Sequence, residues 1–322
     1  MDAPERRAVT TDAEFIKFLE TIGPSAYAKK FGLAVRTVHK RRTKLEKKYC
    51  RQITCPQTSN KPPTRRNIQH APRLHCDVEN GVVLVGSDAH IWPGPLTTAM
   101  RAFIAFAAEL KPRAIILNGD VLDFPKISRH PPIGWESTPT VADEIEAAQS
   151  VLRQIEEAAP DKCKLIWTLG NHDARFETRL ATVAPEYARL HGFHLKDYFP
   201  EWSACWSVWI NNSVVIKHRI KGGVHATHNN TVQSGKHTVT GHLHSQKVTP
   251  WTDYNGTRYG VDTGCLAEPG AQAFVDYTED SPLNWRSGFG VFTFNDGELL
   301  PPELVTVWSP NHVVFRGQIK KV

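Results

Sequence analysis

The central part of the chain alternates short apolar runs with longer amphipathic runs. The apolar runs lie in GVVLVGSDAH (81–90), RAIILNGDVLD (113–123) and CKLIWTL (163–169), and their β-branched residues predict buried strands. Residues 96–110 and 140–159, which lie between these runs, repeat their apolar side chains at helical spacing. Strands that alternate with helices pair in parallel through crossovers, so this pattern predicts an α/β domain.

The second half of the chain changes to strands joined by tight turns. Hairpins are predicted about three turns, at Asn211-Asn212, Asn255-Gly256 and Asn295-Asp296-Gly297. Residues 236–245 add a strand that ends in a histidine motif. This half therefore predicts a sheet with parallel and antiparallel parts, or two sheets packed together.

Residues 1–50 show the pattern of short helices. Thr11 and Glu14 have the spacing of a capping box, and apolar side chains then repeat at helical spacing as far as Ile22. We expect this helix to end at Gly23-Pro24, because proline and glycine interrupt helices.

Three later positions predict a pair of helices that cross closely in this segment. Ala28, Gly32 and Val38 provide a small residue for a close helix crossing, a glycine for a left-handed turn and an apolar anchor. Their spacing resembles that of helix-turn-helix DNA-binding domains over roughly residues 12–49. The resemblance implies that the second helix contacts DNA through Arg36, Thr37, His39, Lys40, Arg41 and Lys44. A basic helical hairpin that docks on a protein is the alternative.

Residues 51–80 predict a linker, because they are rich in Pro, Ser, Thr, Asn and Arg and have no periodicity. The predicted organisation is therefore a helix-turn-helix domain (1–50), a linker (51–80) and a larger domain (81–322). Several possible metal ligands lie near the linker, but their spacing is not that of a familiar zinc site. They are Cys50, Cys55, His70, His75 and Cys76.

Charge is distributed unevenly along the chain. Residues 1–70 carry 16 Lys and Arg against 6 Asp and Glu, a net charge of +10, whereas the remainder carries 23 against 27, a net charge of −4. A basic segment on a slightly acidic body suggests a polyanionic partner, although a solubilising tail would have the same charge.

Compartment and membrane association follow from what the sequence lacks. It has no apolar run of about 18 residues, and its N-terminus has no apolar centre of a signal peptide. The six cysteines are scattered without a framework spacing. We therefore expect a cytoplasmic protein with free thiols that does not enter a membrane.

Polar side chains follow five of the predicted strands at the point where each strand ends. The motifs are D-x-H, G-D-x-x-D, G-N-H-D, a single His and G-H-x-H, and they begin at Asp88, Gly119, Gly170, His218 and Gly241. Carboxyl ends of parallel strands meet at one edge of a sheet, so these groups should lie close together. Imidazole, carboxylate and amide ligands suit Mn, Fe, Zn, Co or Ni, and two ions that share a carboxylate would use them all.

Five motifs in this order resemble the signature of the calcineurin-like metallophosphoesterase family over residues 82–245. The resemblance implies a four-layer α/β/β/α sandwich of two mixed sheets flanked by helices, here preceded by the small all-α domain. It implies one metal held by Asp88, His90, Asp120 and His244. It implies a second metal held by Asp120, Asn171, His218 and His242. Manganese is the expected metal, with iron, zinc, cobalt and nickel as alternatives.

The same resemblance implies the chemistry. Two cations lower the pKa of a bridging water, so that hydroxide attacks phosphorus in line. His172 matches the general acid that protonates the leaving oxygen, and Asp123 matches the carboxylate that orients it.

One position departs from the family pattern, and the role of another stays open. Arg219 follows His218 where the family often has glycine, so His225 and His228 are rival ligands. We favour His218 because it ends a predicted strand. Asp173 either caps the next helix or belongs to the site.

The substrate is expected to be DNA, cleaved by phosphodiester hydrolysis. Protein phosphatases of the family carry arginine directly after the G-D-x-x-D motif, whereas this chain has Phe124 there, and the basic N-terminal segment favours a nucleic acid. Candidate phosphate-binding residues are Arg129, Arg175, Arg179 and Arg219. Three tryptophans are candidates for base stacking, although we favour packing in the core of the second sheet; they are Trp202, Trp206 and Trp209. The architecture suits a phage or mobile-element protein.

Two other functions remain possible on the sequence alone. One is a phosphoesterase for small nucleotides or phosphoproteins, with the N-terminal segment used for docking or regulation. The other is a non-catalytic DNA-binding regulator, against which the complete ligand set argues.

Overall fold

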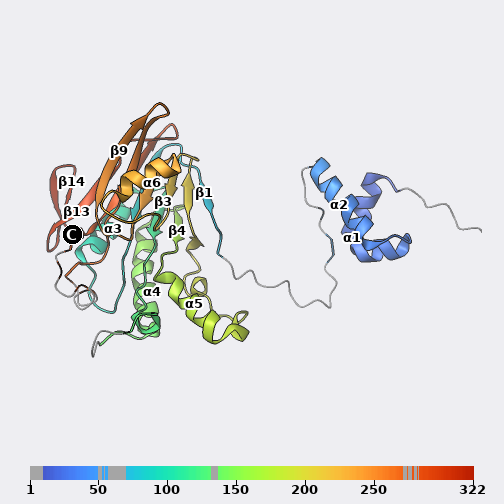
Figure 1. Ribbon diagram of the computed structural model, residues 1–322, viewed down its shortest axis with the longest axis horizontal. Coiled ribbons are helices and arrows are strands. Elements are labelled where there is room, and N and C mark those ends of the chain that lie inside the picture. Colours follow the sequence, from blue (N-terminus) through green and yellow to red (C-terminus); the bar gives the residue numbers. More distant parts are fainter. Residues whose placement is uncertain are drawn as a thin grey trace, which may run out of the picture. The chain divides into compact units, whose positions relative to one another are not determined.

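The computed structural model describes residues 10–49, 53, 55–56, 70–131, 137–270, 274, 278, 281 and 283–322. The chain divides into two compact units, residues 1–67 and 68–322, which we call the head and the body (Figure 1). Each unit has a hydrophobic core of its own. Within these described ranges, no helix is long and apolar enough to cross a membrane.

The head contains two helices, α1 (Asp12–Lys30) and α2 (Val35–Tyr49). The predicted capping box is present, because the Thr11 hydroxyl accepts from the Glu14 N–H and the Glu14 carboxylate accepts from the Thr11 N–H. The predicted end of the first helix at Gly23-Pro24 is confirmed. The backbone leaves helical geometry at Gly23, where φ is 77°, and a second helical stretch of α1 then runs as far as Lys30. Proline is tolerated there because the first turn of a helix has no partner for its N–H groups.

The core of the head forms where the two helices cross. Ala28 and Val38 are 2% and 1% exposed, and Gly32 has a φ of 59°, in the left-handed region. The ring of Tyr27 lies 4.9 Å from that of Phe15, in an edge-on arrangement. The small residue, the turn glycine and the apolar anchor therefore have the positions that their spacing predicted.

Sheet A, the larger sheet of the body, combines a parallel and an antiparallel half. In the described residues its order is β15-β14-β13-β11-β2-β3-β4-β5, with β12 paired to β11. The neighbours from β2 to β5 are parallel, and those from β2 through β11 to β15 are antiparallel. The parallel strands are β2 (Gly81–Gly86), β3 (Ala114–Asn118), β4 (Lys164–Thr168) and β5 (Ser203–Cys205). The others are β11 (Gly288–Asn295), β12 (Glu298–Leu299), β13 (Glu303–Ser309), β14 (His312–Phe315) and β15 (Gln318–Lys321).

Sheet B is also mixed, with the order β1-β6-β7-β8-β10-β9 in the described residues. Its strands are β1 (Leu74–Cys76), β6 (Val208–Ile210), β7 (Val214–Ile216), β8 (His237–Thr240), β9 (Lys247–Asp253) and β10 (Gly256–Asp262). The pairs β7–β8 and β8–β10 are parallel, so the carboxyl ends of these three strands point the same way.

Helices cover the outer faces of the two sheets (Figure 1). α3 (Thr98–Leu110) and α4 (Val141–Ala158) pack against sheet A, and α6 (Ala226–Ser234) packs on β8, β9 and β10. α5 (Asp173–Val183) follows β4 and contacts three short 3-10 turns. These are η1 (Pro125–Ile127), η2 (Pro185–Tyr187) and η3 (Leu195–Asp197). The predicted four-layer sandwich of two mixed sheets is therefore confirmed.

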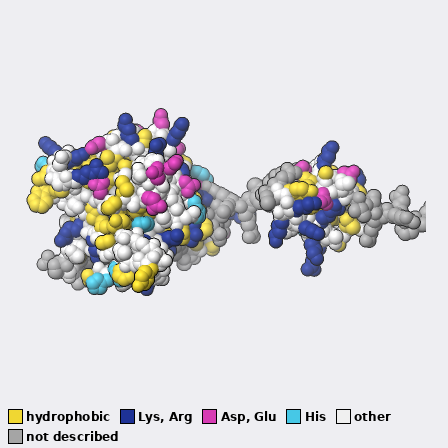
Figure 2. All heavy atoms as spheres, turned by 90° about the horizontal axis from the view of Figure 1, so that it is seen from above, with side chains coloured by type: hydrophobic (Ala, Val, Ile, Leu, Met, Phe, Trp, Pro, Cys, Tyr) yellow, Lys and Arg dark blue, Asp and Glu magenta, His cyan; other side chains and the backbone are white. Residues whose placement is uncertain are grey.

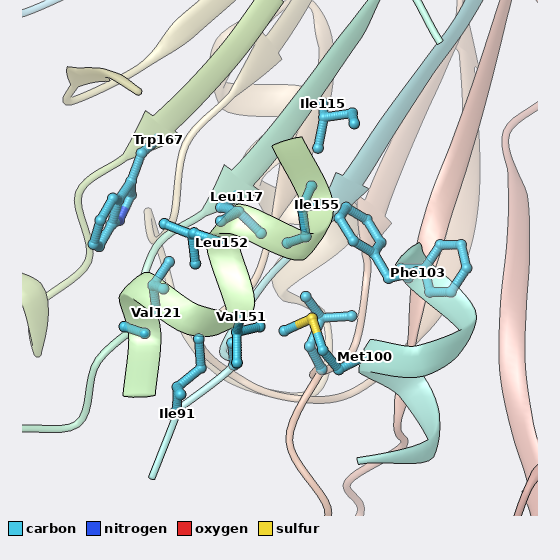
Figure 3. Packing of buried hydrophobic residues seen from close by; sticks show 14 of the residues in the cluster. Ile91, Met100, Phe103, Ile115, Leu117, Val121, Val151, Leu152, Ile155 and Trp167 are labelled. Carbon is cyan, nitrogen blue, oxygen red and sulfur yellow. The ribbon is translucent and has the colours of Figure 1, made fainter. Parts of the chain in front are cut away.

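Two apolar layers hold the body together. Between sheet A and its helices, Leu117 and Trp167 of the strands meet Leu152 and Ile155 of α4, and Phe103 of α3 joins them (Figure 3). Between the two sheets lies a second cluster, made of inward-facing valines and isoleucines of both sheets. Strands β2, β3 and β4 contribute to both layers, which explains their continuous apolar sequences.

Two parts of the body differ from the sequence prediction. β1 pairs in parallel with β6, although the range 51–80 was predicted as a linker. The sequence did not reveal β1 because a three-residue strand is too short to show periodicity. Trp202 is buried between sheet A and its helices rather than in sheet B. Trp206 is 42% exposed, and Trp209 lies under the guanidinium of Arg73.

We predict that Phe289→Ala lowers the stability of the body by about 3–5 kcal/mol. Phe289 is fully buried and its ring contacts Phe103 and Phe106 at 5.1 and 5.4 Å, so truncation leaves a cavity. All nine tryptophans lie in the body, so their fluorescence during urea unfolding reports this unit alone. Ile319→Ala, at a side chain 61% exposed on β15, is the control and should cost less than about 1 kcal/mol. Equal decreases in the two variants would contradict the assignment of this core.

Candidate metal centre

The strand-end motifs converge because the parallel ladder continues beyond the strands. The N–H of Asp88, two residues after β2, donates to the carbonyl of Gly119 after β3 at 2.9 Å. The N–H of His90 donates to the carbonyl of Asp120 at 3.1 Å. In sheet B, the N–H of Gly241 donates to the carbonyl of His218 at 3.0 Å. The loops thus keep the spacing of the strands and hold their side chains together.

The glycines of the motifs allow the close approach of these loops. A Cβ on Gly170 would overlap the carboxylate of Asp120, and a Cβ on Gly241 would overlap that of Asp88. A Cβ on Gly119 would overlap an imidazole of the site. Glycine at these positions is therefore a packing requirement of the site as well as a turn signal.

Many of the candidate ligands have an unusual backbone conformation. Five of them have φ between 42° and 70°, the left-handed region that is strained for residues with a Cβ. They are Asp88, His90, Asp120, His242 and His244. Asp and His tolerate this region better than most residues, and backbone hydrogen bonds between the loops hold it in place. Such strain is concentrated at functional sites.

One group of candidate ligands forms around Asp88, which is fully buried. The Nε2 atoms of His244 and His90 lie 3.0 and 3.9 Å from Oδ1 of Asp88, and ligand atoms of all three residues lie within 4.8 Å of one another. The other oxygen, Oδ2, accepts from the N–H of His242 and from the hydroxyl of Ser87. Asp88 is therefore held by one oxygen and presents the other to the two imidazoles.

A second group forms around Asp120 in the same way. Its Oδ1 accepts from the N–H of His172 at 2.8 Å, and its Oδ2 lies 3.1 Å from Nε2 of His218. Ligand atoms of Asp120, His218 and His242 lie within 4.8 Å of one another. The Nδ1–H of His218 donates to the carbonyl of Asn118 at 2.8 Å, which directs Nε2 into the site.

Buried polar atoms without partners show that both groups suit metal ions. Within the described chain, no hydrogen bond reaches Nε2 of His90, Nε2 of His218, Nδ1 of His244 or Oδ1 of Asn171, all of which are buried. Such atoms are costly unless a ligand satisfies them. Two atoms bound to one first-row ion at about 2.0–2.2 Å lie roughly 3 Å apart, close to the 3.0 and 3.1 Å seen here. The residues therefore fit a centre for two metal ions.

The electrostatics of the site lead to the same conclusion. Burial raises the pKa of Asp88, but the imidazoles of His244 and His218 outweigh it and lower this pKa to about 2. Burial lowers the pKa of His218, but the carboxylates of Asp88 and Asp120 outweigh it and raise this pKa to about 10. The buried carboxylates thus require positive charge, which divalent cations supply more fully than protonated imidazoles.

His172 and Asp123 form a separate pair next to the second group. The Nδ1 of His172 lies 2.7 Å from Oδ1 of Asp123, and its Nε2 lies 3.9 Å from Oδ2 of Asp120. The same Asp123 oxygen lies 3.3 Å from Nδ1 of His90. Burial lowers the pKa of His172, but the hydrogen bond to Asp123 and the charge of Asp120 outweigh it and raise this pKa. This pair can orient an imidazole and hold a proton on it.

Asp173, whose role the sequence left open, belongs to the support of the site. Its carboxylate is 1% exposed and accepts five N–H groups at 2.8 to 3.3 Å. The donors are the backbones of Gly170, Asp120, Val121 and Leu122 and the indole of Trp167. Asp173 therefore fixes the loop after β3 against the loop after β4, and with it the position of Asp120.

The other sequence candidates lie elsewhere. His225 is exposed at the start of α6, and His228 packs against Trp251, so His218 is the one of the three that joins the cluster. Neither Cys55 nor Cys76 belongs to a metal-like group among the described residues, and His70 pairs with Glu177 at 2.9 Å. Cys50 lies outside the described residues.

Sequence reasoning missed two aromatic rings beside the first group. The ring of Trp285 lies 4.3 Å from that of His244, and the ring of Phe274 lies 5.2 Å from that of His90. Both residues follow the last motif by about 30 to 40 positions and share no spacing with it. Only the fold brings them to the site.

We predict that Asp173→Ala lowers the stability of the body by at least about 3 kcal/mol, because it leaves several buried N–H groups unpaired. It should also lower the metal content of manganese-loaded protein, although Asp173 is not a candidate ligand. Urea unfolding and elemental analysis measure the two effects. The control is Asp143→Ala, which removes an exposed capping-box carboxylate of α4 and should cost about 1 kcal/mol with the metal content unchanged. Full metal content in Asp173→Ala would contradict its supporting role.

Comparison with known proteins finds relatives among phage proteins and likenesses among solved structures. The Gene 54 proteins of Mycobacterium phages D29 and L5 are 28% and 27% identical over 259 residues, covering 70% of this chain and 93% of each relative. Among solved structures, Vps29 of Entamoeba histolytica complexed with zinc is 15% identical with a TM-score of 0.38, covering 74% of this chain and 96% of its own. A dimetal phosphatase from Danio rerio is 8% identical with a TM-score of 0.36, covering 71% and 96%.

A family model described as calcineurin-like phosphoesterase matches residues 81–263, more than half of the chain and the segment that carries the candidate ligands. The chain therefore belongs to the calcineurin-like phosphoesterases and is a hydrolase of phosphate esters.

Proposed function

We propose that the protein is a two-metal phosphodiesterase that cleaves DNA, with manganese as its metal and the head as its DNA-binding part. The observation that carries the choice of DNA is the exposed basic face of α2. Figure 2 shows lysine and arginine side chains projecting from the head. A polyanion is the partner that such a surface favours.

The basic face of α2 lies opposite its buried anchors. Val38 and Leu45 are 1% and 4% exposed and face the head core. At 3.6 residues per turn, Arg36 and Lys40 lie about half a turn around the helix from these anchors, and Thr37, His39 and Lys44 lie on its flanks. All five are exposed, the arrangement that a helix needs to contact phosphates or base edges.

Arg41 is the exception among the predicted DNA contacts. Its guanidinium donates to the carbonyl of Thr10 at 2.7 Å, pairs with Asp12 at 3.2 Å and lies over the ring of Phe15. These contacts connect α2 to the start of α1. We therefore assign Arg41 to the stability of the head and leave it out of the proposed DNA surface.

The residues of the body have distinct parts in the proposed hydrolysis. One ion would be held by Asp88, His90, Asp120 and His244. The other would be held by Asn171, His218 and His242 and would share Asp120 with the first. When bound, the two cations would lower the pKa of a water and neutralise charge on the phosphoryl group. His172 would protonate the leaving oxygen through Nε2, because Asp123 holds the opposite nitrogen.

The residue after Asp123 supports a diester rather than a phosphoprotein substrate. Phe124 stands where protein phosphatases of the family carry arginine. It is fully buried, and its ring stacks on that of Phe176 at 5.7 Å. This position therefore offers no cation to the second negative charge of a phosphomonoester.

We predict that His172→Ala lowers kcat on a dinucleotide diester by about 10²- to 10⁴-fold, because an alkoxide leaving group needs a proton. The decrease should be smaller on bis-p-nitrophenyl phosphate, whose leaving group needs little protonation. Steady-state kinetics with manganese measures both, and elemental analysis should show that the metals are retained. His228→Ala is the control and should keep full activity. Equal decreases on the two substrates would exclude the acid role.

We predict that Lys40→Ala/Lys44→Ala weakens binding of a labelled DNA duplex roughly tenfold, because fewer DNA phosphates are then neutralised. The slope of log K against log salt should become shallower by about 0.9 for each phosphate that the variant no longer neutralises. Fluorescence anisotropy over a salt series measures this. Lys17→Ala/Lys29→Ala removes the same charge from α1 and should bind nearly as the wild type does. Activity on bis-p-nitrophenyl phosphate should be equal in all three proteins.

Three outcomes would redirect this proposal. Equal binding by the two double variants would contradict the role of the α2 face. Hydrolysis of the small diester without cleavage of DNA would favour a nucleotide phosphoesterase. DNA binding without any turnover would favour a regulator.

A further inference from the structure

Arg175, in the first turn of α5, is a cationic side chain in direct contact with the candidate acid of the centre. Its Nη1 donates to the carbonyl of Asp123 at 2.8 Å, and its Nη2 lies 3.2 Å from Nε2 of His172. Its side chain is 21% exposed, so the guanidinium is largely buried and keeps a small exposed part. The other candidate phosphate-binding arginines are more exposed or lie outside these contacts; they are Arg129, Arg179 and Arg219.

The contact with His172 marks the path of the substrate. Nε2 of His172 is the atom that meets the leaving oxygen of an ester in the proposed mechanism. A guanidinium only donates hydrogen bonds, so in this structure its N–H faces the lone pair of a neutral Nε2. When Nε2 carries the proton for the leaving oxygen, the two N–H groups no longer pair, and the guanidinium can donate to a substrate oxygen beside it. An anionic phosphate that reaches His172 therefore also reaches Arg175.

Arg175 retains donors for such a ligand. A guanidinium has five N–H donors. The two contacts above use one N–H of Nη1 and one N–H of Nη2. Its nearest approach to a carboxylate is 4.0 Å, to Oδ1 of Asp123, which is too long for a hydrogen bond. A side chain held by a neutral carbonyl keeps its charge available for a phosphate, whereas a bidentate carboxylate partner would compete for it.

The position of Arg175 agrees with a diester substrate. The carbonyl that Arg175 binds belongs to Asp123, the residue directly before Phe124. Arg175 thus supplies one cation for the single negative charge of a diester, and residue 124 adds none for the second charge of a monoester.

We propose that Arg175 is the substrate-binding arginine of this centre and that its guanidinium binds a non-bridging oxygen of the scissile phosphate beside His172. This inference rests on the proposed phosphodiester hydrolysis. It assigns to α5 both the support of the metal loops, through Asp173, and the binding of the phosphate.

The test compares Arg175→Ala, Arg175→Lys and the control Arg153→Ala in the full-length, manganese-loaded protein. Arg153 lies on α4 and is exposed, so its removal takes away the same charge without the contact. Bis-p-nitrophenyl phosphate is the substrate and inorganic phosphate the competitive probe. We expect Arg175→Ala to raise KM and the inhibition constant of phosphate by about 10- to 100-fold. We expect Arg175→Lys to give a smaller rise and Arg153→Ala to behave as the wild type.

Two further readouts separate binding from support. The metal content of Arg175→Ala should equal that of the wild type, and added methylguanidinium should restore part of its affinity for phosphate. A decrease in kcat with an unchanged inhibition constant for phosphate would overturn the proposal and leave Arg175 as a support for Asp123 and His172. If Arg175→Ala does not fold, an unchanged inhibition constant in Arg175→Lys has the same consequence. A wild-type protein that hydrolyses no ester would instead contradict the proposed function.

Discussion

Two buried carboxylates, those of Asp88 and Asp120, are the constraint on which the rest of the body depends. They are 0% and 2% exposed, and a buried charge is costly unless it is paired and hydrogen-bonded. In each, one oxygen accepts from a backbone N–H of a neighbouring loop and the other faces imidazoles. This division leaves one oxygen of each carboxylate directed at a shared space, which is the arrangement that two cations require.

The fold maintains this arrangement by strain and close packing. The left-handed backbone at Asp88, Asp120 and His244 would relax in an isolated loop, because that conformation is unfavourable for most residues. It persists because the parallel ladder, the close-packed glycines and the carboxylate of Asp173 fix the loops from several sides. Each group combines ligands from the loops of both sheets, so the apolar layer between the sheets sets the distances within each group. Core packing and site geometry are therefore parts of one constraint.

The sequence predicted the strands, helices and strand-end motifs because their signals are local. The apolar, β-branched runs indicated that β2, β3 and β4 are buried, and their alternation with helices indicated that they are parallel. The rule that parallel strands end at one edge then brought Asp88 and Asp120 together. The contacts of Arg175, Trp285 and Asp173 depend on the tertiary fold and have no spacing that reveals them. β1 was missed because three residues carry no period. Gly23 was correctly identified as the point at which the first helical stretch ends, and the stretch that follows carries Ala28.

Anomalous X-ray diffraction from crystals of the manganese-loaded protein tests the central claim most directly. Two anomalous peaks about 3.5–4 Å apart are expected, one on each side of the Asp120 carboxylate. The first should be bounded by Asp88, His90 and His244, and the second by Asn171, His218 and His242. A single peak, or peaks away from these side chains, would contradict the account of a shared aspartate between two metal ions.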